Sequence, residues 1–166
     1  YVIGADVAEG LEHGDYSVAH VVDVRSNKVV AVWHGHESPD DFGEHVLANL
    51  GNYYGGCLIG VESNNHGIST IKGLRDAEYR NLFVERAHNK KTAAPSERYG
   101  FRTTQTSKPL IIDELGRMIR NETLYIPDNA TRHELRTFVR DGDLKMHGSP
   151  LDDRTMSLAI AVHMMQ

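Results

Sequence analysis

The sequence predicts an α/β fold with a mixed sheet, in which an antiparallel three-stranded meander is followed by parallel strands, with helices on both faces. Three observations support this prediction. Near the beginning of the chain, short apolar runs rich in β-branched residues alternate with short polar turns, which is typical of antiparallel hairpins. Farther along, apolar runs alternate with segments of helical spacing, which is typical of parallel crossovers. The final segment is apolar at most positions, which indicates a buried helix.

The expected meander consists of strands 1–5, 17–24 and 29–33. The first run is rich in β-forming residues and ends at Asp6, and a polar segment that contains Gly10 and Gly14 separates it from the next run. Residues 25–27 read as a turn between the second and third strands. Because both connections are short, we expect two antiparallel hairpins in succession.

The parallel part is expected to begin with a helix that starts after Ser38 and stops near Gly51. Residues 57–61 form an apolar run that is too short for a helix and is better interpreted as a central strand. The further expected elements are a helix around 68–75, a strand at 81–85, a long functional loop or small excursion from the core at 88–109, a helix at 110–119, an edge strand at 123–126, a helix at 131–139 and a last helix from Asp152.

Length and composition point to one domain. The chain has 166 residues, of which 40% are hydrophobic and 25% are charged, as is ordinary for a globular protein. No apolar run approaches the roughly 20 residues that a membrane span requires, so we expect a soluble protein. The single cysteine, Cys57, is expected to be a small core residue in a reducing compartment. Because Tyr1 already lies in an apolar run, we expect the chain to be part of a longer polypeptide.

The net charge of −5 does not exclude a polyanionic partner such as DNA. An enzyme that holds divalent cations carries a local surplus of acid, and the bound cations reverse its sign. One stretch of the chain is distinctly basic, and two interpretations of it stay open, a solvated charged loop or a set of phosphate contacts. Its cationic residues and histidine are Arg86, His88, Lys90, Lys91, Arg98 and Arg102.

Three acidic residues stand at the ends of predicted elements. Asp6 ends the first strand, Glu62 ends strand 57–61, and Asp153 lies in the first turn of the last helix. The first strand and strand 57–61 can lie side by side, because the chain leaves through the meander and returns by a helix. Asp6 and Glu62 would then be neighbours, and the last helix can bring Asp153 to the same edge.

Converging carboxylates require a compensating cation. A pair about 4 Å apart at an effective dielectric constant near 20 costs on the order of 4 kcal/mol. Oxygen ligands without matching cysteine or paired-histidine spacing favour Mg²⁺ or Mn²⁺ over zinc. Two such ions can activate a water molecule and stabilise the leaving oxygen of a phosphodiester, which predicts two-metal cleavage of nucleic acid.

Each acid also has a simpler interpretation. Asp6 could cap a turn, Glu62 could pair with an arginine such as Arg86, and Asp153 could favour the helix N-terminus through the helix dipole. Asp15 more plausibly shapes the first hairpin than binds metal. The joint occurrence of the three acids favours the metal hypothesis over these separate explanations.

The sequence resembles the nuclease domain of the large terminase subunit of tailed bacteriophages, which belongs to the RNase H-like superfamily. The resemblance covers almost the whole chain, and its pieces occur in the family's order. The matching residues are 4–10 with 15–18, 61–67, 100–104 with 107–109, Glu134, Leu135 and Phe138, and 152–154.

The resemblance implies an RNase H-like fold and an endonuclease that cuts concatemeric viral DNA during genome packaging with two divalent cations, Mg²⁺ or Mn²⁺. It implies that Asp6, Glu62 and Asp153 are catalytic and that these three, with Asp152, bind the metals. Lys108 joins the basic stretch as a candidate DNA contact, beside Arg86, Lys90, Lys91 and Arg102.

The resemblance further implies that residues 1–166 are a single nuclease domain, the C-terminal domain of a longer terminase large subunit. The sequence contains no Gly-x-x-x-x-Gly-Lys-Ser/Thr loop, so ATP hydrolysis is not expected from this chain. The implied partners are double-stranded DNA, the ATPase motor domain, the small terminase subunit and the portal, with no membrane. We expect a monomeric, phage-encoded chain in the cytoplasm of the host bacterium.

Three alternative functions remain open at the level of sequence. Another RNase H-like nuclease, such as a junction resolvase or transposase core, would use the 86–108 stretch to recognise branched DNA. An actin-like nucleotide-binding module also begins with a Gly-x-Asp strand and hairpins. A DNA-binding domain that has lost catalysis is the third alternative.

Overall fold

The computed structural model of the protein describes residues 1–88, 95–140, 146–147 and 152–166. Its centre is a four-stranded sheet in the order β3-β2-β1-β4. Strands β1 (Val2–Asp6), β2 (Ser17–Asp23) and β3 (Lys28–Gly35) are antiparallel neighbours. Strand β4 (Leu58–Val61) pairs with β1 in parallel. The predicted mixed sheet with an antiparallel meander is therefore confirmed.

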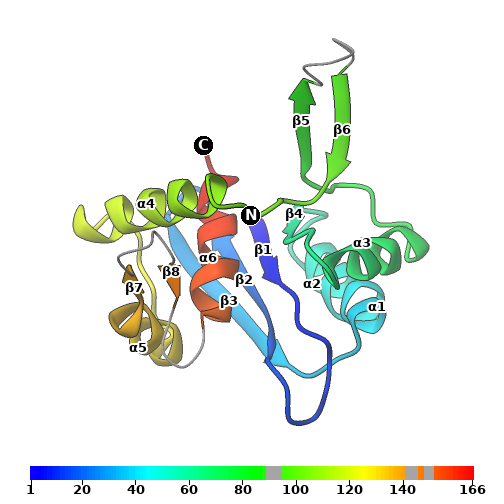
Figure 1. The fold of residues 1–166 in the computed structure, drawn as a ribbon, viewed down its shortest axis with the longest axis horizontal. Helices are drawn as coiled ribbons and strands as arrows, with labels where there is room; N and C mark the ends of the chain where they lie inside the picture. Colours follow the sequence, from blue (N-terminus) through cyan, green and yellow to red (C-terminus); the bar gives the residue numbers. More distant parts are fainter. Residues whose placement is uncertain (89–94, 141–145, 148–151) are drawn as a thin grey trace.

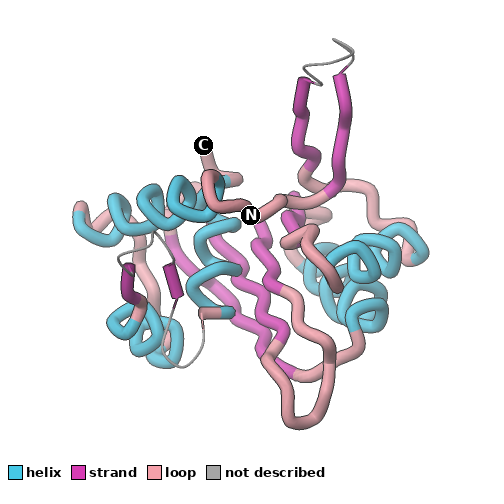
Figure 2. Tube along the Cα trace, viewed as in Figure 1, coloured by secondary structure: helices cyan, strands magenta, loops and turns pink. Residues whose placement is uncertain are grey.

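Helices cover both faces of this sheet, as predicted (Figures 1 and 2). A continuous helical segment, made of α1 (Pro39–Asp41), a π-helical turn (Phe42–Leu47) and α2 (Ala48–Tyr53), packs with α3 (Gly67–Asp76) on one face. Helices α4 (Ser107–Arg120) and α6 (Asp153–His163) lie on the other face. Helix α5 (Asn129–Thr137) contacts α6, and two-residue strands β7 (Val139–Arg140) and β8 (Met146–His147) pair near it.

Two apolar clusters fill the space between the sheet and these helices, and the alternation of side chains along each strand assigns residues to them. In β1, Val2 belongs to the cluster under α4 and α6, whereas Ile3 and Ala5 belong to the cluster under α1–α3. Cys57 is buried in the second cluster, which confirms its predicted place in the core. The same alternation directs Asp6 toward the α6 face.

The expected strand at 81–85 is only partly correct. Leu82 forms an isolated parallel bridge to Ile59 of β4, but β5 (Val84–His88) pairs with β6 (Pro95–Tyr99) instead of extending the sheet. The reason is that Phe101 takes the next position along the free edge of β4, where it donates its N–H to the carbonyl of Val61 at 2.8 Å. Residues 84–88 therefore do not continue along that edge.

The segment 88–109 is an excursion from the core, one of the two forms expected for it, but it is more regular than a loop. The β5–β6 hairpin projects from the body of the molecule (Figure 1), and α4 begins inside the segment at Ser107. The expected edge strand 123–126 is reduced to one parallel bridge between Tyr125 and Lys28.

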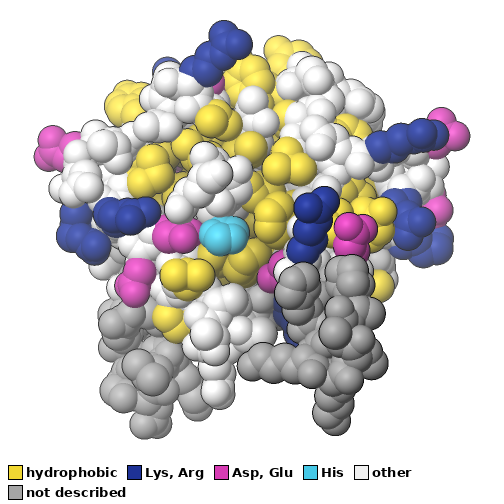
Figure 3. Space-filling view, turned by 90° about the horizontal axis from the view of Figure 1, so that it is seen from above, with side chains coloured by type: hydrophobic (Ala, Val, Ile, Leu, Met, Phe, Trp, Pro, Cys, Tyr) yellow, Lys and Arg dark blue, Asp and Glu magenta, His cyan; other side chains and the backbone are white. Residues whose placement is uncertain are grey.

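The surface is mixed in character. In the view from above, apolar side chains gather near the centre of the face, and most lysine and arginine side chains lie nearer its rim (Figure 3). Within the described residues, no helix has the combination of length and apolar character that crossing a bilayer requires.

Candidate metal centre

Asp6 and Glu62 lie side by side at the end of the sheet. Ala5 is the register partner of Val61, and the N–H of Glu62 donates to the carbonyl of Ala5 at 2.8 Å. Asp6 and Glu62 are the next residues on the two parallel strands, so they are neighbours across the β1–β4 pair. Asp6 is only 8% exposed, and the Glu62 side chain lies close enough to raise its pKa. The adjacency predicted from the sequence is confirmed.

Helix α6 brings Asp153 to the same end of the sheet. The helix packs directly on Gly4 of β1, where an added Cβ would lie 2.1 Å from the carbonyl oxygen of Ser157 and 2.4 Å from the amide nitrogen of Ala161. Only glycine permits this approach. Because Asp153 is the first residue of α6, the close packing on β1 places its carboxylate near that of Asp6.

The electrostatics of the cluster disfavour full ionisation. Burial raises the pKa of Asp6 well above its usual range, and the neighbouring carboxylates of Glu62, Asp153 and Asp152 raise it further. Burial also raises the pKa of Asp153 to about 7, with added repulsion from the carboxylates of Asp15, Asp152 and Glu134. Such clustering of acids with raised pKa values is characteristic of functional sites.

The side chain of Glu62 is held by two polar neighbours. The hydroxyl of Thr103 donates to its Oε1, and the Nδ2 of Asn64 donates to the same oxygen at 3.3 Å. The turn after Glu62 is tight, since a Cβ on Gly67 would lie 1.6 Å from the Glu62 carbonyl oxygen. Glu62 therefore sits on a constrained turn. Its predicted alternative partner, Arg86, instead pairs with Glu97 at 3.6 Å.

Asp152 forms an ion pair with Lys108, in which the Nζ lies 2.7 Å from the Oδ2 of Asp152. Both side chains are partly buried, with 28% and 26% of their surfaces exposed. Lys108 was predicted as a DNA contact, and the structure places it beside one of the predicted metal ligands. This ammonium group offsets part of the negative charge at the acidic edge.

Two further acids lie near Asp153, of which sequence reasoning missed Glu134 and assigned Asp15 to the first hairpin. Glu134 of α5 accepts hydrogen bonds from the backbone N–H and the hydroxyl of Thr155, at 2.6 and 2.8 Å. Asp15, interpreted as a hairpin residue, lies close enough to Asp153 to raise its pKa. Both residues lie in segments of the sequence that resemble the terminase nuclease family, but the resemblance assigns no role to either.

Of the predicted DNA contacts other than Lys108, two lie within the described residues. Arg86 is 82% exposed on the projecting hairpin, and Arg102 is exposed just beyond it, where it lines a cavity with Asn64 and Asn65. Lys90 and Lys91 lie outside the described residues.

The donor set suits a hard divalent cation. The Oδ2 of Asp153 is buried and has no hydrogen-bond partner in the described part of the chain, and the neighbouring donors at this edge are carboxylate oxygens, which Mg²⁺ and Mn²⁺ prefer. In their present positions, however, no three His, Cys, Asp or Glu side chains among the described residues form a ready ligand set. The residues therefore fit a divalent cation by chemistry, and binding requires their side chains to adjust.

No protein-family model and no curated protein matches the chain. Solved structures do resemble it. The large terminase nuclease of thermophilic phage G20c with bound magnesium is 22% identical, with a TM-score of 0.77, over 98% of this chain and 80% of that one. The nuclease domain of the Thermus phage P74-26 large terminase is 22% identical, with a TM-score of 0.67, over 96% of this chain and 76% of that one.

A more distant neighbour comes from an animal virus. The human cytomegalovirus terminase nuclease domain, soaked in manganese and bound to an inhibitor, is 8% identical, with a TM-score of 0.62, over 99% of this chain and 83% of that one. The G20c nuclease is also known with bound cobalt and with bound zinc. The predicted resemblance is thus confirmed at the level of the fold, which all of these chains share.

Proposed function

From the fold that it shares with large terminase nuclease domains, we propose that this chain is a metal-dependent DNA endonuclease. The observation that carries the proposal is the convergence of Asp6, Glu62 and Asp153 at one end of the β1–β4 pair. The related G20c terminase nuclease holds magnesium, cobalt or zinc, and the cytomegalovirus domain was soaked in manganese. Acids from three distant parts of the chain have no evident structural reason to share this edge.

In this proposal Asp6, Glu62 and Asp153 hold two divalent cations, Mg²⁺ or Mn²⁺, and Asp152 is a further ligand. When bound, the cations supply an activated water and stabilise the leaving oxygen of the phosphodiester. The chain's own residues position the acids. The N–H of Val7 donates to the Oδ1 of Asp6 at 3.0 Å, while Thr103 and Asn64 orient Glu62.

Two further groups complete the arrangement. Glu134 binds the first turn of α6 and so fixes the position of Asp153. Lys108 holds Asp152 by an ion pair, and a DNA phosphate that approached the site would compete for the same ammonium group. Arg86, Lys90, Lys91 and Arg102 are the remaining candidate phosphate contacts.

The biological role that fits this chemistry is cleavage of concatemeric viral DNA during genome packaging. Residues 1–166 would form one nuclease domain of a longer subunit that also carries the ATPase motor. The small terminase subunit and the portal would then be its partners, in the cytoplasm of the host bacterium. Of the three neighbours described, none is a junction resolvase, a transposase or an actin-like protein.

Asp6→Asn tests the proposal. We expect the wild-type chain to cleave supercoiled plasmid in Mn²⁺ or Mg²⁺, and the variant to fall to the level measured in EDTA, because a neutral amide lacks the negative charge with which a buried carboxylate holds a divalent cation. The readout is conversion of plasmid to nicked and linear forms on a gel.

Glu122→Gln is the matched control, since Glu122 is an exposed carboxylate just beyond the end of α4 and lies outside the proposed site. Circular dichroism verifies that both variants are folded. Undiminished cleavage by folded Asp6→Asn protein would refute the assignment.

A further inference from the structure

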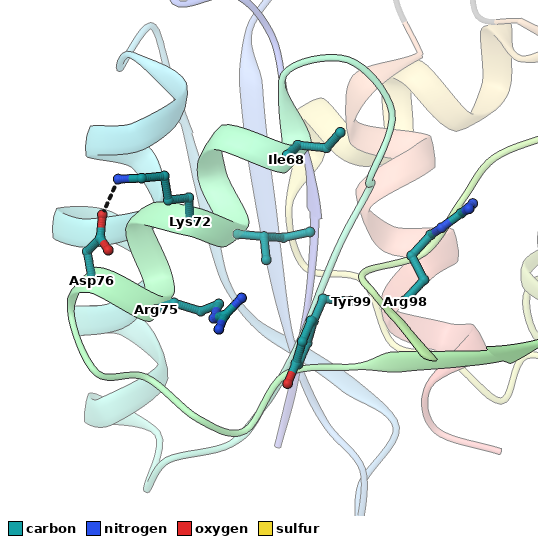
Figure 4. Close-up of a pocket in the computed structure, with 7 residues that line it drawn as sticks. Ile68, Lys72, Arg75, Asp76, Arg98 and Tyr99 are labelled. Carbon is teal, nitrogen blue, oxygen red and sulfur yellow. Dashed lines mark hydrogen bonds and ion pairs between the residues drawn. The ribbon is translucent and has the colours of Figure 1, made fainter. Parts of the chain in front are cut away.

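A groove runs between α3 and strand β6, at the base of the projecting hairpin. It consists of two adjoining cavities of about 500 and 580 Å³, which share Ile68, Arg98 and Tyr99. We call it the α3–β6 groove. Figure 4 shows its α3 end, where Arg75 extends from α3 toward the ring of Tyr99, while Lys72 turns away toward Asp76.

The charge of the α3–β6 groove is opposite in sign to that of the chain as a whole. Its lining includes the guanidinium groups of Arg75, Arg98 and Arg102. The carboxylate among its lining residues, Asp76, lies 2.5 Å from the Nζ of Lys72 and is neutralised by it. A chain with a net charge of −5 therefore presents a locally cationic channel. Guanidinium groups match the geometry of phosphate oxygens.

An aromatic ring lies among these cations. Tyr99 is 44% exposed, and the Cζ of Arg75 lies 5.4 Å from the centre of its ring. Exposed aromatic rings interleaved with arginine are the usual platform for nucleic-acid strands, because bases stack on the ring while the backbone follows the positive charge. An acidic peptide would use the arginines but would gain little from the planar ring.

The α3–β6 groove leads to the acidic edge. Ser63 and Asn64 line its other end, and the Nδ2 of Asn64 donates to the Oε1 of Glu62 at 3.3 Å. A strand that lay in the groove would therefore reach Glu62, whose carboxylate is one of the proposed metal ligands. The lining of this end by Asn64 and Asn65 also supplies neutral donors for backbone oxygens.

The geometry points to the α3–β6 groove as the binding site for one polynucleotide strand, with Arg75 and Arg98 on its phosphates and Tyr99 against a base. This inference rests on the proposed nuclease function in one respect. The groove is expected to guide the strand to Glu62 only if Glu62 belongs to the site of cleavage. It assigns to α3 a substrate contact that lies outside the basic stretch 86–108.

The test measures binding separately from cleavage. Fluorescence anisotropy in EDTA follows a fluorescein-labelled single strand of about 20 nucleotides, long enough to span several phosphates, across a salt series. We expect Arg75→Gln to weaken binding and to reduce the slope of log K against log salt by about 0.7, the value for one lost phosphate contact on a single strand. Tyr99→Leu should weaken binding with the slope unchanged, because stacking releases no counterions.

The matched control is Arg117→Gln, which removes an exposed arginine from the far end of α4, on the opposite side of the molecule from α3 (Figure 1). It should leave both affinity and slope unchanged. Arg75→Lys keeps the charge and should restore the slope. If Arg75→Gln does not fold, Arg98→Gln provides the same measurement on the strand side of the groove.

An affinity and salt slope for Arg75→Gln equal to those of the wild-type chain would overturn the inference. Competition by poly-glutamate as strong as that by unlabelled oligonucleotide would also overturn it, because it would make the site a general polyanion or acidic-peptide site. A chain that binds the strand in this way but never cleaves DNA would instead contradict the proposed function and leave the groove assignment standing.

Discussion

The three central acids occupy different environments at the scale of single residues. Asp6 is buried beside Glu62, Glu62 is held by Thr103 and Asn64, and Asp153 has a buried oxygen without a partner in the described residues. Burial without full compensation penalises the charged form of a carboxylate, so these residues favour function over stability.

This penalty makes stability depend on pH. Because the pKa of Asp153 is raised to about 7 in the folded chain, from 3.8 when unfolded, folding is favoured at acidic pH and loses this contribution as pH rises from about 4 through 7. We expect the free energy of unfolding in EDTA to fall over this range, by at most about 3 kcal/mol from Asp153, because solvent screens part of the charge of this half-buried carboxylate. Urea unfolding at a series of pH values measures it.

Asp153→Asn is the control, because the amide does not ionise, and its pH profile should be flatter than that of the wild-type chain. The raised pKa of Asp6 acts in the same direction, so some slope remains in this variant. A steeper loss of stability in Asp153→Asn than in the wild-type chain would contradict this account.

At the scale of elements, α5 acts as a brace for the first turn of α6. The carboxylate of Glu134 accepts from Thr155, and Arg154 donates to Asp128 at 3.3 Å. The buried ring of His20 in β2 connects the same two helices, since it lies 2.6 Å from the hydroxyl of Ser157 and 2.8 Å from that of Thr131. Burial lowers the pKa of His20 to about 3, so this bridge is neutral under ordinary conditions.

Glu134→Ala tests the brace. Loss of a carboxylate that satisfies free N–H groups at a helix N-terminus should lower the free energy of unfolding by about 1–3 kcal/mol. Cleavage should fall as well, because Asp153 loses its fixed position. Thermal unfolding and the plasmid assay measure the two effects.

Glu44→Ala, at an exposed glutamate on the opposite helical layer, serves as the control and should change neither quantity. Glu134→Gln retains one acceptor oxygen and should recover part of the stability. If Glu134→Ala were as stable as the wild-type chain, α5 would not stabilise the first turn of α6.

Elements were predictable where one pattern dominated. The apolar run of β1 and the apolar composition of α6 predicted these two elements, and the adjacency of Asp6 and Glu62 was predicted from their positions at strand ends. The outcome at 81–85 was not predictable, because the β4 edge is shared between Leu82, opposite Ile59, and Phe101, opposite Glu62, and this division depends on packing between segments distant in sequence. The brace by Glu134 was hidden for the same reason, since its partner Thr155 is 21 residues away.

At the scale of the whole molecule, the three acids come from distant parts of the sequence and meet at one end of the sheet. Asp6 ends β1, Glu62 follows β4, and Asp153 begins α6. Strand β1 is central, with β2 on one side and β4 on the other, and α6 packs across it. The overall arrangement was predictable because the antiparallel connections are short and the parallel one contains a helix. The direction of the β5–β6 hairpin was not, since few core contacts specify it.

A cation that binds only the folded cluster should stabilise the whole molecule. We expect Mn²⁺ at about 100 times its dissociation constant to add about 2.7 kcal/mol to the free energy of unfolding, seen as a higher melting temperature than in EDTA. Asp6→Asn should show a much smaller increase. An equal increase in the variant would mean that the ion binds elsewhere.

The meeting of β1 and α6 also has a consequence for synthesis on the ribosome. Asp6 and Glu62 are translated before Asp153, which follows Glu62 only after 90 further residues, since the two are numbered 153 and 62. A nascent polypeptide therefore lacks one of the three acids until its last helix emerges and docks on Gly4. Assembly of the complete cluster therefore waits for translation of α6, and a nascent chain that stops before α6 cannot form it.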